Sequence, residues 1–280
     1  MTASTPVRLG AVSYLNARPL VYGLERDPRF DLRYDIPAEC ARLLHAGAID
    51  VGLIPSIEYL RGPQPYALVP GAAVTSHGPV ASVAIYTRVE PRDIRSIAMD
   101  RSSRTSVALA TVMLHRVFGA APEPVSMAPD LDAMLAGADA ALLIGDYALF
   151  LDHQSAICNL QSAIAKIDLG ELWSSHTSLP FVYAFWTARS GALTPEDVGR
   201  LQQARDHGVA RSDDVAAACY AGDPARQEVA RRYLRDNIQY GLGQEELAGL
   251  RTFYRYASEL GLVTFDGSLR IDHAEHHGAR

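Results

Sequence analysis

The sequence has few cysteines, no run of basic residues and no long apolar run. Its three cysteines, Cys40, Cys158 and Cys219, lie far apart, without the spacing of a metal site or a disulfide framework. No window approaches the roughly 18 consecutive apolar residues of a membrane span. Residues 1–6 lack the basic and apolar segments of a secretory signal. We therefore predict a cytoplasmic protein with reduced thiols, in which Cys40 and Cys219 are core residues.

The charge balance limits the possible partners. The net charge of the 280-residue chain is −6, and the sequence contains no basic-aromatic stripe. This argues against nucleic acid as a partner. An anionic small molecule remains compatible, because a local site can oppose the global charge. With 48% hydrophobic residues, the chain has enough apolar surface for one or two globular domains. The sequence does not distinguish a monomer from a homodimer.

The first ninety residues alternate strand-like and helix-like segments. Strand-like apolar runs cover 7–12, 48–54, 66–69 and 81–86, and residues 38–46 have apolar side chains at helical spacing. This rhythm predicts a mostly parallel sheet with covering helices. A second series of strands and helices then follows, with strands over 94–99, 139–144 and 181–186 and helices over 105–118 and 147–151.

The last third of the chain is predicted to be helical only. Thr194-Pro195-Glu196-Asp197 is a strong helix start. Residues 225–240 and 243–260 are long amphipathic segments. Two α/β halves followed by helices are typical of a two-lobed clamp whose C-terminal helices pack on the first lobe.

The predicted lobes are discontinuous in sequence. Lobe 1 is expected to comprise residues 1–88 and 189–280, and lobe 2 residues 89–188. The chain would then cross between the lobes at about 83–88 and 182–188. A small ligand would bind in the cleft between them, which is a common location for such sites.

A candidate site lies where the first strand ends. The run 7–12 leads into Ser13-Tyr14-Leu15-Asn16, followed by a helix start that contains Pro19. Ligands of α/β proteins bind at the carboxyl ends of strands, so Ser13 and Asn16 are candidate binding residues. The alternative is an ordinary helix start, with one of the two as N-cap.

Several blocks between residues 7 and 190 occur in an order that points to one family. They are 13–20, 49–59, 78–83, 103–106, 141–146, 168–173 and 177–182. Together they resemble the chorismate dehydratases of the futalosine route to menaquinone. Segments 233–240 and 250–253 fit the family more loosely. Ser178 departs from the pattern, because glycine is expected at that position.

The resemblance implies an α/β, periplasmic-binding-protein-like (type II) fold used as an enzyme. It implies dehydration of chorismate to 3-[(1-carboxyvinyl)oxy]benzoate, with no cofactor and no metal. The serine and asparagine that match Ser82 and Asn16 belong to the active site of that family, so these two residues are the candidate catalytic groups. The candidate substrate-binding residues are Ser13, Ser56, Ser103, Thr105, Ser106, Gly145 and Asp146.

Two predicted helix starts suit an anionic substrate. Residues 103–106 and the pair Pro55-Ser56 each join a preceding segment to a helix, so backbone N–H groups and hydroxyls there can hold a carboxylate. Without the resemblance, simple helix capping by Ser103, Thr105 and Ser56 is the more economical interpretation. With it, we favour substrate binding.

The matched blocks are short of a protein base. Asp146 directly follows a strand and is a candidate acid or base, or alternatively an N-cap. His77 and His176 are predicted loop histidines that rank below Asp146 as candidate catalytic groups. Our hypothesis is that the enolpyruvyl carboxylate of the substrate removes the ring proton, so that positioning supplies most of the acceleration. Arg18 is expected to have a structural role.

Two alternative functions remain at this point. One is the sister enzyme of the same pathway, 1,4-dihydroxy-6-naphthoate synthase, but that family carries a histidine where this sequence has Gly145-Asp146. The other is a non-catalytic small-anion-binding protein with the same clamp. A solute-binding protein of an importer would need a signal segment, and an effector-binding domain would need a DNA-binding segment.

Overall fold

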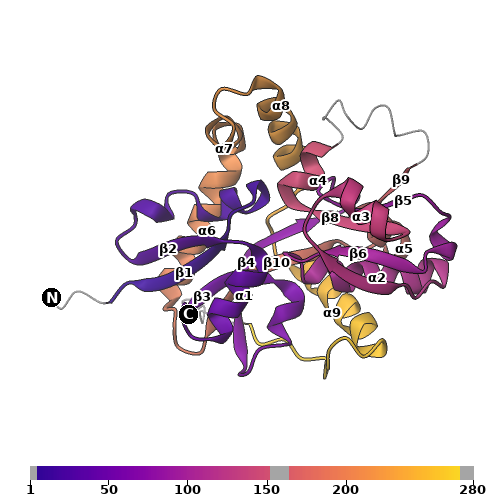
Figure 1. The fold of residues 1–280 in the computed structure, drawn as a ribbon. Coiled ribbons are helices and arrows are strands. Elements are labelled where there is room, and N and C mark those ends of the chain that lie inside the picture. Colours follow the sequence, from indigo (N-terminus) through magenta and orange to yellow (C-terminus); the bar gives the residue numbers. More distant parts are fainter. Residues whose placement is uncertain (1–4, 152–163, 272–280) are drawn as a thin grey trace.

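The fold consists of two α/β lobes built on two separate sheets (Figure 1). The computed structural model describes residues 5–151 and 164–271, so Cys158 lies outside the described residues. The first sheet has the strand order β2-β1-β3-β10-β4. Its strands are β1 (Val7–Val12), β2 (Phe30–Asp35), β3 (Val51–Pro55), β4 (Tyr66–Ser76) and β10 (Phe181–Arg189).

The second sheet has the order β7-β6-β8-β5-β9. Its strands are β5 (Val83–Thr87), β6 (Ser96–Asp100), β7 (Glu123–Met127), β8 (Ala140–Ile144) and β9 (Ala165–Asp168). Both sheets are mixed, so the expectation of a mostly parallel sheet is only partly correct. The antiparallel strands are β10 in the first sheet and β5 in the second. Each of these two strands enters its sheet from the other lobe, and therefore runs against its neighbours.

Helices pack on both sheets. The α-helices are α1 (Pro37–His45), α2 (Thr105–Phe118), α3 (Leu131–Gly137), α4 (Gly145–Leu151), α5 (Leu169–Thr177), α6 (Pro195–Ala210), α7 (Ser212–Cys219), α8 (Pro224–Arg232) and α9 (Gln244–Glu259). Short 3-10 helices are η1 (Leu15–Val21), η2 (Leu24–Arg26), η3 (Ser56–Tyr59) and η4 (Pro91–Asp93). One π-helical turn, η6 (Tyr233–Asn237), follows α8.

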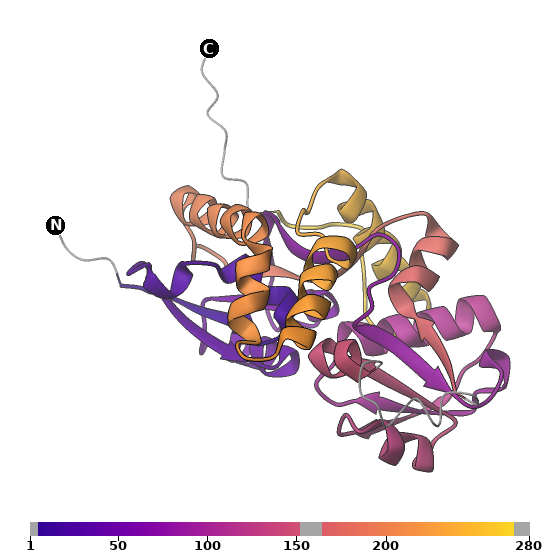
Figure 2. The same cartoon turned by 90° about the horizontal axis from the view of Figure 1, so that it is seen from above.

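The C-terminal helices divide their contacts between the lobes. Helix α6 packs on η1 and β4, and α7 also packs on η1, as predicted for helices of the first lobe. Helix α9 contacts both β10 and α2, and Figure 2 shows it (yellow) between the two lobes. Its Phe253 meets Phe181 of β10 with ring centroids 4.9 Å apart, and Phe181 meets Trp173 of α5 at 5.2 Å. These aromatic side chains join both lobes in one core.

The membership of the two sheets bears on the lobe boundaries. Strand β5 belongs to the second sheet and β10 to the first, so the chain changes sheets at 77–82 and returns at 178–180. We therefore propose that lobe 2 comprises residues 83–177, which begins 6 and ends 11 residues before the predicted boundaries of 89 and 188. The ends of both crossing segments lie beside the cleft described below.

The two described cysteines differ in environment. Cys40 on α1 is fully buried, and its burial raises the pKa of the thiol to about 12. Cys219 is exposed, so the prediction of a core residue is wrong there. Helix α7 buries Val215 and Ala216, and Cys219 at its last position lies outside this buried face.

Candidate active site

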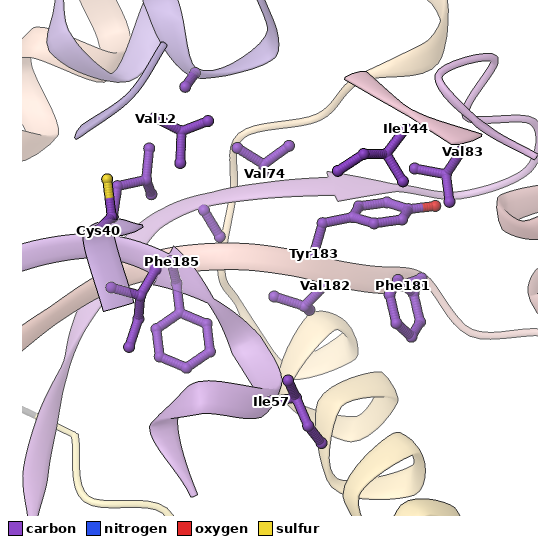
Figure 3. Packing of buried hydrophobic residues seen from close by; sticks show 14 of the residues in the cluster. Val12, Cys40, Ile57, Val74, Val83, Ile144, Phe181, Val182, Tyr183 and Phe185 are labelled. Atoms are coloured by element: carbon purple, nitrogen blue, oxygen red, sulfur yellow. The ribbon is translucent and has the colours of Figure 1, made fainter. Parts of the chain in front are cut away.

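A cavity lies between the lobes, at the carboxyl ends of β1, β3 and β8. It contains about 550 Å³ of space free of protein atoms, part of which is open to solvent. Much of its wall is apolar. Figure 3 shows Val83 and Ile144 of the second sheet beside Tyr183 of β10.

The polar groups of the cavity come from both lobes. They are Tyr14, Asn16, Ser82, Ser103, Arg104, Thr105, Ser106 and Tyr183. Arg104 is the one charged residue among the described lining residues. Such a wall suits a ligand with apolar faces and negative groups at its ends.

Ser82 and Asn16 are brought together through a residue that we did not predict. The Ser82 hydroxyl is 2.7 Å from the Tyr233 hydroxyl of η6. The Asn16 side chain lies close to the same Tyr233 hydroxyl and acts to lower the pKa of that phenol. Because Tyr233 is buried, the pKa of its phenol is raised, and it remains a neutral hydrogen-bonding group. A serine from one lobe and an asparagine from the other thus meet at one tyrosine.

The N-terminus of α2 points its first turn at the cavity. Ser103, Arg104, Thr105 and Ser106 all line it. The Thr105 hydroxyl accepts a hydrogen bond from the Ile57 N–H at 3.2 Å and lies 3.3 Å from the Ser56 hydroxyl. The first-turn N–H groups and the helix dipole make this end favourable for an anion.

Gly145 allows the lobes to approach closely. Its φ is +64°, and a Cβ at this position would lie 2.8 Å from the Tyr14 ring. Tyr14 extends from the end of β1 and its hydroxyl lies 3.0 Å from that of Ser102 in the other lobe. Gly145 lines the cavity, and its N–H donates to the Ser82 carbonyl at 2.8 Å.

Asp146 makes contacts between the lobes and does not line the cavity. Its carboxylate accepts from the Leu15 N–H at 2.9 Å and from the Tyr220 hydroxyl at 3.1 Å. Burial raises the pKa of this carboxyl, while the two hydrogen bonds act in the opposite direction. Asp146 therefore caps η1 from the other lobe. The predicted alternative, a side-chain cap from Ser13 or Asn16, is not formed.

Two further predicted residues lie off the cavity wall. Ser13 follows β1, and its N–H donates to the Asp35 carbonyl at 3.0 Å. Ser56 is fully buried, and its hydroxyl donates to the Val182 carbonyl at 2.8 Å. Neither residue is among the lining residues of the cavity.

The loop histidines and Arg18 also lie outside the cavity. His77 and His176 are both exposed, and His176 belongs to α5 rather than to a loop. The Arg18 guanidinium lies 4.3 Å from the centroid of the Tyr34 ring, in a packing contact on lobe 1. Neither histidine reaches the wall of the cavity.

Titratable bases are scarce at this site. Among the described residues, the cavity wall contains no Asp, Glu, His or Lys. Burial raises the pKa of Tyr14 and Tyr183, so these phenols stay protonated near neutral pH. Over residues 5–151 and 164–271, no group of three His, Cys, Asp or Glu side chains is arranged to bind a metal ion. No helix in the same described part is long and apolar enough to cross a membrane.

Sequence reasoning missed the three site tyrosines. Tyr14 and Tyr183 lie within or beside predicted strands, where aromatic residues usually serve the core. Tyr233 falls in the long amphipathic segment 225–240, and its spacing there gave no sign that the helix changes to a π-turn. A π-turn at a helix end is itself a frequent mark of functional sites, but it is visible only in the structure.

The fold is shared with solved structures of low sequence identity. A protein from Archaeoglobus fulgidus matches with a TM-score of 0.70 at 18% identity, covering 93% of this chain and 100% of that one. The alkanesulfonate-binding protein SsuA from Xanthomonas axonopodis pv. citri matches with a TM-score of 0.61 at 17% identity, covering 96% and 98%. A Candida albicans protein described as having the generic periplasmic binding protein fold matches with a TM-score of 0.65 at 11% identity, covering 94% and 93%. The predicted periplasmic-binding-protein-like fold is confirmed.

Sequence comparison gives a more specific result. A chorismate dehydratase from Thermus thermophilus is 32% identical over 266 residues, which cover 92% of this chain and 96% of that protein. A family model described as menaquinone biosynthesis matches residues 7–259, which include all the residues that line the cavity. The chain therefore belongs to the menaquinone biosynthesis family.

Proposed function

We propose that this protein is a hydro-lyase that dehydrates chorismate to 3-[(1-carboxyvinyl)oxy]benzoate in menaquinone biosynthesis, without a cofactor. The observation that carries the proposal is the composition of the cavity wall. It combines a helix N-terminus, one arginine and neutral hydroxyl and amide groups with an apolar surface. Chorismate is a small ring with two carboxylates, so it needs anion-binding donors and few acidic neighbours. The similarity to a chorismate dehydratase supports the same substrate.

Different parts of the substrate would bind at the two ends of the cavity. One carboxylate is expected at the N-terminus of α2, where Ser103, Ser106 and the backbone N–H groups can donate to it. Arg104, at the same helix start, adds a positive charge. The ring then lies toward Asn16 and Ser82, which come from opposite lobes.

The base in this proposal is the enolpyruvyl carboxylate of the substrate. It takes the proton from the ring carbon that bears the ether, and the C–H electron pair forms the new ring double bond. The C–O bond to the neighbouring hydroxyl breaks, and the departing hydroxide takes the proton from the newly formed carboxylic acid and leaves as water, which restores the carboxylate. Asn16 and Ser82 hydrogen-bond the reacting groups, and Tyr233 orients the Ser82 hydroxyl from behind. The absence of a carboxylate or imidazole among the described lining residues supports this assignment.

The first experiment is incubation of the purified protein with chorismate alone, followed by liquid chromatography and mass spectrometry. A product lighter than chorismate by one water, with the enolpyruvyl group intact, is the expected result. Ser82→Ala and Asn16→Ala should each lower kcat by at least tenfold, whereas exposed His176→Gln should not change it. Unchanged chorismate with the wild-type protein, despite clear binding, would refute the enzyme and favour a small-anion-binding protein.

A second experiment tests the identity of the base. Asp146 is the carboxylate that the sequence suggests for this role, and its oxygens are already bonded to Leu15 and Tyr220. Asp146→Asn retains an acceptor for the Leu15 N–H, so we expect it to keep most of the turnover. If this variant binds product normally but loses nearly all turnover, Asp146 is the base and the substrate-assisted mechanism is wrong.

A further inference from the structure

Ser82 is delivered to the cavity by an unusual backbone turn. The preceding residue, Ala81, has a φ of +62°, in the left-handed region that side-chain-bearing residues avoid. The Ser82 N–H donates to the Val80 carbonyl at 2.7 Å, so residues 80–82 form a tight three-residue turn. Only one other non-glycine residue among those described, Ser178, has a positive φ. Such strain persists only where surrounding groups hold it in place.

The carboxylate of Asp168 holds this turn. It accepts from the Val80 N–H at 3.0 Å through Oδ1 and from the Ala81 N–H at 2.7 Å through Oδ2. Asp168 is also the N-cap of α5, where Oδ1 accepts from the Gly170 and Glu171 N–H groups at 2.9 and 3.0 Å. One carboxylate therefore serves four backbone donors, two on the helix and two on the strained turn.

A capping role alone does not account for this arrangement. An N-cap needs only the helix contacts, which a serine can also make. The two contacts to Val80 and Ala81 instead fix the residues directly before Ser82. The turn places the Ser82 side chain in the cavity wall, where its hydroxyl meets that of Tyr233.

We infer that Asp168 is a positioning residue for Ser82: it holds Ala81 in its left-handed conformation and thereby sets the direction of the Ser82 hydroxyl. This inference rests on the proposed function in that Ser82 acts on chorismate. Asp168 itself does not line the cavity. It acts on the reaction only through the backbone of residues 80–82.

The test separates the turn from the helix cap. Asp168→Ser keeps a good capping side chain for α5 but is too short to reach Ala81. Asp130→Ser is the matched control, because Asp130 caps α3 in the same lobe through the Ala133 N–H and has no contact with the turn. We expect Asp168→Ser to lower kcat by at least tenfold with a small change in KM, and Asp130→Ser to change neither.

The rescue variant is Ala81→Gly, because glycine adopts a positive φ without the steric cost that alanine meets. In the Asp168→Ser background it should restore kcat at least threefold, and in the Asp130→Ser background it should have no effect. Additive effects of Asp168→Ser and Ala81→Gly would overturn the inference, since independent sites add. Full activity of Asp168→Ser would overturn it as well.

An activity-independent measurement keeps this inference distinct from the proposed function. Hydrogen exchange of the Ser82 amide, followed by NMR, reports on its bond to the Val80 carbonyl. Exchange should accelerate in Asp168→Ser and slow again when Ala81→Gly is added. If the wild type does not dehydrate chorismate but this pattern holds, the proposed function fails and the positioning stands. If exchange is unchanged in Asp168→Ser, the positioning fails whatever the activity.

Discussion

Gly145→Ala should weaken the contact between the lobes by an amount that the structure allows us to work out. A left-handed φ costs an L-residue roughly 1–2 kcal/mol, and Gly145 has a φ of +64°. The new Cβ would also lie 2.8 Å from the Tyr14 ring, closer than van der Waals contact. Displacing that ring breaks the Tyr14–Ser102 hydrogen bond, which contributes about 1 kcal/mol. The expected loss in unfolding free energy is therefore about 2–3 kcal/mol.

Gly191→Ala is the matched control for this prediction. Its φ is +73°, but a Cβ there meets nothing within 4 Å, so only the backbone cost of roughly 1–2 kcal/mol applies. Denaturant unfolding of both variants isolates the steric part as the difference between them. Chorismate turnover should fall at least tenfold in Gly145→Ala and remain unchanged in Gly191→Ala. Equal destabilisation together with equal activity would refute the close approach of Tyr14.

Three further substitutions test other parts of the structure. Arg29 lowers the pKa of Asp197 from 3.8 to about 2, so Asp197→Asn should cost about 2 kcal/mol near neutral pH. The difference in unfolding free energy between wild type and variant should shrink as the pH falls from about 4 through about 2, because the wild-type carboxylate becomes protonated in this range. A difference that does not change with pH would contradict this prediction. Ser178→Gly should raise the unfolding free energy by about 1 kcal/mol, because Ser178 has a φ of +58°; no gain in denaturant would count against it. Tyr233→Phe should lower kcat about tenfold, which corresponds to roughly 1.4 kcal/mol of transition-state stabilisation, because the Ser82 hydroxyl loses its hydrogen-bond partner. Unchanged kinetics would exclude a role of Tyr233 in orienting Ser82.

The sequence was sufficient for elements with clear periodicity and clear ends. Strand β1 and helix α2 have the predicted bounds, 7–12 and 105–118. Strand β4 is longer than predicted, because its pairing with β10 continues past the Pro70-Gly71 interruption through register shifts. Strand β7 was missed because most of its side chains are exposed at a sheet edge, so no apolar pattern marks it.

The sequence predicted which strand and helix ends contribute to the candidate site. It did not predict which side chains line the cavity and which lie behind the lining residues. The start of α2 and Ser82 were identified through matched blocks, and both line the cavity. The roles of Asp146 and Ser56 depend on partners more than 70 residues away in sequence, such as Tyr220 and Val182. Local pattern carries no information about such distant pairing, so their places behind the wall required the structure.

The same contacts that build the cavity also hold the lobes together, which has a consequence for ligand binding. Tyr14 contacts Ser102 and Gly145, and Asp146 contacts Leu15, all at the edge of the site. These contacts bury groups that an opening of the lobes would return to water. A ligand that contacts both lobes stabilises only the arrangement in which the lobes are closed. Its binding free energy therefore depends on the stability of the interlobe contacts. Substitutions such as Gly145→Ala should therefore weaken substrate affinity through the lobe contact, in addition to any direct effect on the cavity wall that Gly145 lines.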